Sequence, residues 1–249
     1  MGSYMIKSSG GRVVGRSHLL VKSPCQDDFS HKIKFNSGCI ALADGAGSKF
    51  YSHLGAKIVT RKLVEICLSE FDKIDALIND HPPKAAEYLV DRMRKTLLPV
   101  SVKKKIAVTD MACTLIFFSC KENRYIAGHI GDGVLFLRKD GEIFVLSEPQ
   151  NGEYANSTYF VTDSNAASKF RVYSGLLGRK FGVMAMSDGS AESLWSKQSK
   201  NPSLAAQRMF EWFDRMPIRK MNEIIQINLE QVIRQKTTDD CSLVMMTNG

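Results

Sequence analysis

Apolar residues recur along this chain with two spacings, and each spacing predicts a type of element. Over residues 52–71 they return every three or four positions, with Lys, Arg and Glu between them, which predicts a helix packed on one side. A second helix is predicted over 84–102, opened by Pro82 and Pro83 and interrupted or ended near Pro99. Shorter apolar runs, bounded by Gly, Asn and Asp, predict strands.

The predicted strands alternate with short polar turns along the chain. A strand within 4–14 precedes a hairpin whose strands cover 29–35 and 39–43, with its turn at 36–38. The middle of the chain predicts an antiparallel meander with strands over 112–120, 124–130, 134–138 and 142–146. Further strands are predicted over 158–162, 170–173, 181–187 and 241–247, and further helices over 191–197, 203–213 and 218–234.

This order of elements predicts an α+β fold in which two antiparallel sheets pack together with helices outside. No internal repeat, low-complexity tract or composition break marks a second domain, so residues 1–249 are expected to form a single domain. Residues 147–168 are polar and are expected to form a loop. Residues 1–4, ahead of Met5, resemble an expression scar.

Aspartates stand at the ends of several predicted strands. Asp44 follows the apolar run 40–43, Asp132 follows 126–130, Asp188 follows 183–187, and Asp239 and Asp240 precede the last strand. One Asp-Gly alone is more often an ordinary turn, but the pattern recurs, so these strands could bring their carboxylates together. Such a cluster repels itself and implies bound cations.

The first acidic pair, Asp27 and Asp28, fits the same arrangement. The predicted hairpin would place Asp27 and Asp44 on neighbouring strands at the same end. Carboxylate oxygens suit Mg²⁺ or Mn²⁺, whereas zinc prefers His or Cys, and the chain has no H-x-x-x-H or H-E-x-x-H spacing. The residues alone therefore predict an oxygen-ligated divalent metal site.

Cysteine usage and the absence of targeting segments indicate the cellular compartment of the protein. The six cysteines form no C-x-x-C pair, so we expect reduced, buried thiols rather than zinc ligands or disulfides. No signal peptide or membrane-spanning run is evident, which favours a cytoplasmic protein.

The net charge of +8 is compatible with nucleic-acid binding, but the basic residues lack interleaved aromatics. A solvated helix face, or a basic rim that attracts anionic substrates, is the favoured interpretation.

The ordered set D-G-A-G, G-D-G, S-D-G and D-D-C-S resembles the metal-dependent protein phosphatases of the type 2C family, from Gln26 to Ser242. The segment 152–160 is similar to a short bacterial branch of that family. The resemblance implies an α-β-β-α sandwich that hydrolyses phosphoserine or phosphothreonine in proteins with Mg²⁺ or Mn²⁺. It implies a monomeric cytoplasmic enzyme that acts on phosphoproteins, the targets of a cognate kinase, and not on nucleic acid or at a membrane.

The resemblance also implies roles for particular residues. Asp44 would bridge two metal ions, and the carbonyl of Gly45 would bind one of them. Asp188 and Asp239 would bind the other ion, so Asp44, Asp188 and Asp239 are the predicted catalytic residues. Two ions about 3.5–4 Å apart would acidify a bridging water molecule and neutralise the phosphoryl oxygens.

Three more acidic residues are predicted metal ligands with lesser roles. Asp27 would contact metal mainly through water. Asp132 would share a third, weaker metal site with Asp188. Glu192 stands where the family often has another aspartate, and Asp240 is expected to support Asp239.

Substrate-binding residues are where the chain departs from the family. The glutamate of the family's Asn-Glu-Asp motif is Gln26, and the family's phosphate-holding arginine corresponds to Lys22. A lysine offers a point charge, so its grip on phosphate would be weaker or shared with Arg16. A histidine found in many eukaryotic members is replaced by Ala46, which leaves the leaving-group acid unassigned.

Some features keep two interpretations open. Lone histidines such as His18 and His53 are more often structural than functional. Tyr154, Asn156 and Tyr159 could border the site or could pack their loop onto the sheet. A catalytically weak, phosphoprotein-binding module is the alternative function, against which the complete set of aspartates argues.

Overall fold

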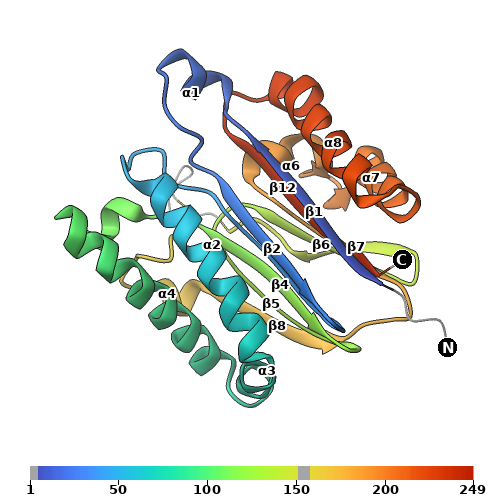
Figure 1. Ribbon diagram of the computed structural model, residues 1–249, viewed down its shortest axis with the longest axis horizontal. Helices are drawn as coiled ribbons and strands as arrows, with labels where there is room; N and C mark the ends of the chain where they lie inside the picture. Colours follow the sequence, from blue (N-terminus) through green and yellow to red (C-terminus); the bar gives the residue numbers. More distant parts are fainter. Residues whose placement is uncertain (1–4, 151–157, 249) are drawn as a thin grey trace.

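Two five-stranded antiparallel sheets lie face to face in the computed structural model, which describes residues 5–150 and 158–248 (Figure 1). The first sheet has the order β1 (Ile6–Val13), β12 (Cys241–Asn248), β9 (Phe181–Met186), β6 (Val134–Lys139) and β7 (Glu142–Ser147). The second sheet has the order β2 (Asp28–Lys34), β3 (Ser37–Ala43), β4 (Leu115–Lys121), β5 (Arg124–Ile130) and β8 (Arg171–Leu176).

Helices cover the outer face of each sheet, which confirms the predicted α-β-β-α sandwich. The second sheet carries α2 (Ser52–Ser69), α3 (Phe71–Asp80), α4 (Pro82–Lys104) and the short α5 (Ala166–Lys169). The first sheet carries α6 (Asp188–Leu194), α7 (Leu204–Arg215) and α8 (Ile218–Asn228). A short helix, α1 (Arg16–Leu20), follows β1, and a small hairpin joins β10 (Trp195–Ser196) to β11 (Asn201–Pro202).

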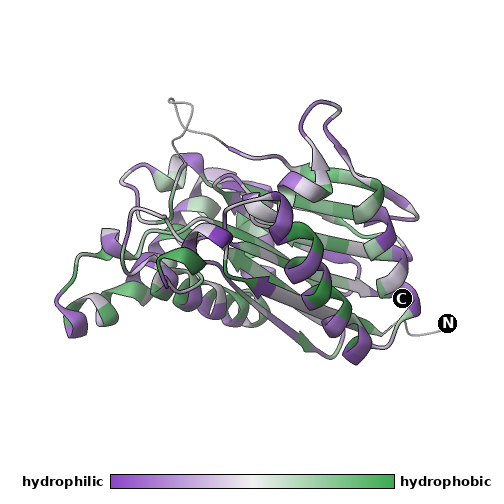
Figure 2. Cartoon of the chain, turned by 90° about the horizontal axis from the view of Figure 1, so that it is seen from above, coloured by the Kyte–Doolittle hydropathy of each residue, from purple (hydrophilic) through white to green (hydrophobic). Residues whose placement is uncertain are grey.

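Alternation along the strands explains why the sheets stack. In β3, Ile40 and Leu42 belong to the core between the sheets, whereas Cys39, Ala41 and Ala43 belong to the core under α2 and α4. Both faces of a central strand are therefore apolar, as expected for a sheet covered on both sides. Figure 2 shows hydrophobic colour concentrated on the strands and on the inward sides of the helices.

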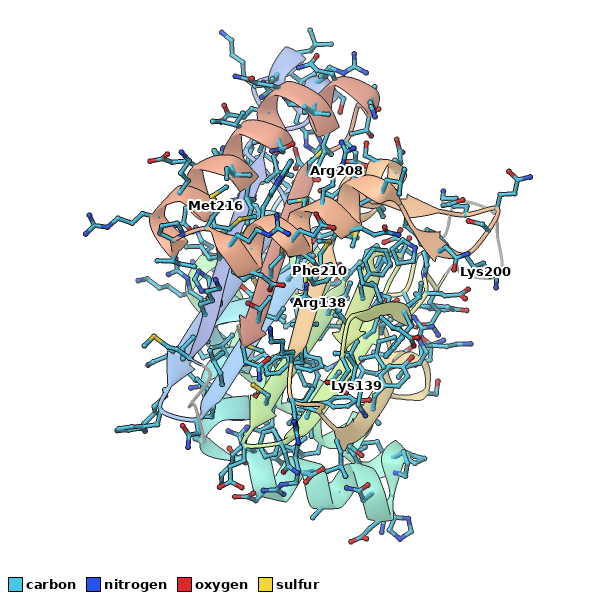
Figure 3. All side chains as sticks on the ribbon, turned by 90° about the vertical axis from the view of Figure 1, so that its right-hand side faces the viewer. Arg138, Lys139, Lys200, Arg208, Phe210 and Met216 are labelled. Carbon is cyan, nitrogen blue, oxygen red and sulfur yellow. The ribbon has the colours of Figure 1, made fainter. Side chains whose placement is uncertain are left out.

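An arginine on β6 connects the first sheet to α7. The Arg138 guanidinium lies 5.0 Å from the centre of the Phe210 ring and donates two hydrogen bonds, of 2.8 and 2.6 Å, to the Asp214 carboxylate (Figure 3). Stacking on a ring while forming a bidentate ion pair uses both properties of the guanidinium. This pairing satisfies Arg138 at the surface of the fold.

The predicted meander is wrong in one respect. Strands β4–β5 and β6–β7 are antiparallel pairs, but they belong to different sheets. The chain passes between the sheets at residues 131–133, where two glycines flank Asp132. Short-turn connections predicted the pairs correctly, but they did not predict which sheet each pair joins.

Four further differences concern helices and a loop. Pro99 lies inside α4 and does not end it, since Met93 and Leu97 are buried on the packed face of the helix. The predicted helix over 218–234 is α-helical only to Asn228 and then continues as a π and a 3₁₀ turn. Residues 158–162 form no strand, and α3 was not predicted.

The turn between β2 and β3 is two residues, Phe35 and Asn36, rather than three, and Phe35 has a φ of 52°. Residues 1–4, the suspected scar, lie outside the described residues. Within the described part of the chain, no helix combines the length and the apolar character needed to cross a membrane.

All six cysteines are unpaired in the structure, and five of them are buried. We expect six thiols to react in denaturant without reductant, because buried thiols are protected from oxidation. Titration with a thiol reagent under denaturing conditions checks this. A count of four or fewer would show that a disulfide forms in the purified protein.

Candidate active site

One end of the sandwich contains a cavity of about 420 Å³, called the main cavity here. Four carboxylates line it, from Asp44, Asp132, Asp188 and Asp239. Its other lining residues are Gln26, Gly45, Ala46, Gly47, Ser48, Thr114, Thr158 and Phe160. Both sheets therefore contribute acidic strand ends to one space, as the sequence predicted.

Strand register explains how distant aspartates meet. In the hairpin, Asp28 pairs with Ala43, so Asp27 and Asp44 lie at adjacent strand ends. In the first sheet, Leu243 pairs with Met186, and the Ser187 amide donates to the Ser242 carbonyl at 3.2 Å. This pairing brings the start of β12 against the end of β9. Asp239 and Asp188 are thus placed on the same side of the cavity.

The turn that carries Asp132 depends on glycine. Gly131 has a φ of 120°, a conformation that side chains rarely adopt. A Cβ atom there would also lie 2.5 Å from the Thr114 side chain. The chain can therefore leave β5, cross to β6 and present Asp132 to the cavity only with a glycine before it.

Two threonines hold aspartates of the main cavity in place, and no sequence motif predicted either of them. The Asp44 amide donates to Thr114 Oγ1 at 2.9 Å, and the Thr114 amide donates to the Asp44 carbonyl at 2.8 Å. Thr158 Oγ1 donates to Asp132 Oδ2 at 2.5 Å. Because these contacts join residues 70 and 26 positions apart, no local motif marks them.

Burial and mutual repulsion raise the pKa values of the aspartates. Burial raises the pKa of Asp44 well above its usual range, and the charges of four other aspartates raise it further: Asp27, Asp188, Asp132 and Asp239. Burial, then repulsion by Asp132 and Asp239, raises the pKa of Asp188 to about 7. Burial also raises the pKa of Asp239. Asp44 is thus the carboxylate that all the others influence.

Asp27 is buried behind this cluster. Burial, then repulsion by Asp240, raises its pKa to about 7. The hydroxyls of Ser187 and Ser242 lower that pKa, but neither carboxylate oxygen has a well-formed hydrogen bond. A buried carboxylate without partners is costly, and a nearby cation would offset this cost.

The donor set therefore fits hard divalent cations. Every acidic group in the main cavity supplies oxygen, and the described histidines and cysteines do not line it. Within residues 5–150 and 158–248, no three His, Cys, Asp or Glu side chains are already arranged to hold an ion. The carboxylates would reorient about an ion as it binds.

Glu192 does not line the main cavity. It lines an adjoining cavity of about 230 Å³, in which Asp132 and Asp188 also take part. Glu192 lies one turn after Asp188 on α6 and is exposed. Its placement is compatible with a role beside Asp132 and Asp188, and that role stays a prediction.

Lys22 and Arg16, the predicted substrate-binding residues, do not line the main cavity. Lys22 is exposed after α1, with a φ of 53°. Arg16 is also exposed, and its Nε donates to the Thr237 carbonyl at 2.8 Å. Their roles in holding phosphate stay predictions.

Two interpretations were open for Tyr154, Asn156 and Tyr159 in the loop before β8: they border the site, or they pack the loop onto the sheet. Tyr154 and Asn156 lie outside the described residues. Tyr159 packs against the core under α2 and α4, and Lys169 Nζ lies 4.8 Å from the centre of its ring. The packing role is therefore the one that Tyr159 fits.

Asp240 connects three segments around the site. Its carboxylate accepts hydrogen bonds from the amides of Gly15 and Gln26, both at 2.6 Å. His18 Nδ1 lies 3.0 Å from the same carboxylate, at ion-pair distance but without a well-formed hydrogen bond. Asp240 therefore fixes the chain on both sides of α1 to the start of β12.

Replacing Asp240 with alanine is expected to destabilise the fold. Two buried amides lose a charged acceptor, so the free energy of unfolding should fall by about 3 kcal/mol. Asp240→Asn keeps one acceptor oxygen and should lose less. Urea unfolding of both variants measures the free energy of unfolding. Equal stability of Asp240→Ala and the unaltered protein would show that the Asp240 hydrogen bonds do not stabilise the fold.

Comparisons with known proteins agree with this geometry. The family model described as Protein phosphatase 2C matches residues 14–234. Serine/threonine-protein phosphatase 3 of Escherichia coli (strain K12) is 29% identical over 181 residues, which cover 71% of this chain and 70% of that protein.

Solved structures share the fold at low sequence identity. The catalytic domain of the serine/threonine protein phosphatase PstP, in complex with two manganese ions, has a TM-score of 0.66 and 16% identity, covering 98% of this chain and 99% of that one. The S. agalactiae serine/threonine phosphatase also has a TM-score of 0.66, with 12% identity over 97% and 99% of the two chains. The chain therefore belongs to the protein phosphatase 2C family of metal-dependent serine/threonine phosphatases.

Proposed function

We propose that this chain hydrolyses phosphoserine and phosphothreonine in phosphoproteins with two Mn²⁺ or Mg²⁺ ions held in the main cavity, and that a third ion binds more weakly. One observation carries the proposal. Asp44, which is half-buried, lines the main cavity together with Asp132, Asp188 and Asp239, and desolvation and the neighbouring carboxylates raise its pKa. Such a cluster is stabilised when divalent cations enter it.

Particular residues would hold the ions. Asp44, between the other carboxylates, is the candidate bridge, with the Gly45 carbonyl beside it. Asp188 and Asp239 would complete the second site, and Asp132 with Asp188 would form the third. Asp27, buried behind the cavity, would act through water.

Residues around the main cavity position the aspartates that would bind the ions. When bound, the two ions would acidify a water molecule and neutralise charge on the phosphoryl oxygens. Thr114 fixes the backbone of Asp44 on both its amide and its carbonyl. The Gly189 amide donates to Asp188 Oδ1 at 2.6 Å, where the start of α6 also favours a negative charge. These contacts fix the backbone of Asp44 and one carboxylate oxygen of Asp188 at the cavity.

Phosphate release from a phosphoserine peptide tests the proposal. We expect turnover with Mn²⁺ and none after treatment with EDTA, and added Mn²⁺ should restore the rate. Binding of the peptide without turnover at saturating Mn²⁺ or Mg²⁺ would instead support the catalytically weak binding module.

A further inference from the structure

A second cavity, called the side pocket here, adjoins the main cavity on the side of α2. It has a volume of about 280 Å³ and shares Gln26, Gly47 and Ser48 with the main cavity. Its remaining lining residues are Ser23, Pro24, Lys49, Phe50 and His53. The two cavities therefore lie side by side, with these three residues at their common boundary.

The side pocket differs in charge from the main cavity. Lys49 and His53 line it, and none of its described lining residues is Asp or Glu. Lys49 is half-buried, and its ammonium group has no hydrogen bond, ion pair or ring contact to the described parts of the chain. A half-buried cation without a partner can bind an anion at little cost in lost contacts.

Further basic residues surround the same place. Burial lowers the pKa of His53, and the nearby charges of Lys104, Arg12 and Lys57 lower it further, although the Phe50 carbonyl acts in the opposite direction. Lys104, from the end of α4, lies 5.6 Å from the centre of the Tyr51 ring at the start of α2. The basic run at the end of α4 thus contributes to a positive field over the side pocket.

Opposite charges in adjoining cavities suit a substrate with two anionic groups. The phosphoryl group belongs in the main cavity, where cations would offset the carboxylates. Successive side chains of an extended peptide point to opposite faces, so a side chain two positions from the phosphorylated residue, about 6.6 Å along the strand, lies on the same face and would reach an adjoining pocket. A metal-free basic pocket can hold a carboxylate, but it lacks the ions needed to hydrolyse an ester.

On the basis of the proposed function, we infer that the side pocket binds the carboxylate of an Asp or Glu that flanks the phosphorylated residue. Lys49 supplies the charge that selects it. The enzyme therefore prefers phosphorylated sites with acidic neighbours.

Matched peptides test this preference. Phosphoserine peptides with a single Glu, at each position from −2 to +2, are compared with peptides that carry Gln there, which has the same shape without the charge. We expect kcat/KM at saturating Mn²⁺ to favour Glu by about 5- to 30-fold at one position at least. In Lys49→Ala the ratio should fall to about one, and in Lys49→Glu it should fall below one.

Controls separate charge from folding and from the reaction itself. Lys62→Ala removes the same charge from α2, about 14 Å further along the helix from His53, where Lys62 pairs with Glu65 at 3.0 Å. Its Glu-to-Gln ratio should equal that of the unaltered protein. Melting temperatures show whether Lys49→Ala folds, and Lys49→Gln provides a second neutral variant.

Three outcomes would overturn the inference: no preference for Glu at any position, a preference that survives in Lys49→Ala, or an equal loss on Glu and Gln peptides. The last would show that Lys49 acts on the phosphoryl group. If no peptide is hydrolysed, the proposed function fails, and the same ratio measured as peptide affinity still decides the role of the side pocket.

Discussion

Asp188→Asn and Asp239→Asn are each expected to lower kcat/KM for a phosphopeptide by about 10³-fold or more at saturating Mn²⁺. Both residues line the main cavity, from the N-terminus of α6 and from the segment before β12. Asparagine keeps the size of the side chain but removes the charge that a cation needs. Each variant should therefore fold and yet hold its ion poorly.

A matched control uses an aspartate outside the site. Asp91→Asn makes the same chemical change on α4, where Asp91 is half-exposed and pairs with Lys95 at 2.7 Å. It should leave kcat/KM within about twofold, because exposed ion pairs contribute little. Near-normal turnover of Asp188→Asn or Asp239→Asn, with metal in excess, would remove these residues from the proposed ligand set.

Asp44→Asn is expected to abolish turnover and at the same time to stabilise the metal-free protein. Burial and the neighbouring carboxylates raise the pKa of Asp44, so this group opposes folding at neutral pH. Asparagine removes the cost, and each kcal/mol gained should raise Tm by about 2–4 °C in a chain of this size. The gain should disappear below about pH 4, where the carboxyl group is protonated in both states.

Metal should reverse the order of stability. Ions that bind only the folded state add about 2.7 kcal/mol at a concentration 100 times Kd. We expect Mn²⁺ to raise the Tm of the unaltered protein and to leave that of Asp44→Asn nearly unchanged. Thermal unfolding at pH 7, with EDTA and with Mn²⁺, gives all four values. A metal-free Asp44→Asn protein that melts below the unaltered one would contradict the account.

The carboxylates of the site could be predicted because their signal is local. Each one follows or precedes an apolar strand, and several repeats of this pattern point to one cluster. The predicted hairpin also placed Asp27 and Asp44 at the same end, although its turn is one residue shorter than predicted and its register differs accordingly.

The contacts that the sequence did not predict are those that form only in the folded chain. Thr114 and Thr158 orient Asp44 and Asp132 from distant positions. The sheet to which each strand pair belongs depends on the passage through Gly131, and Pro99 is tolerated within α4, which packs against α2 and α3. The side pocket likewise combines a loop before β2 with the start of α2.

Diffraction from crystals soaked in Mn²⁺, recorded where manganese scatters anomalously, tests the central claim most directly. Two strong anomalous peaks about 3.5–4 Å apart are expected. Both should lie within ligand distance of the Asp44 carboxylate, and one should also contact Asp188 and Asp239. A single peak, or peaks outside the main cavity, would contradict the account.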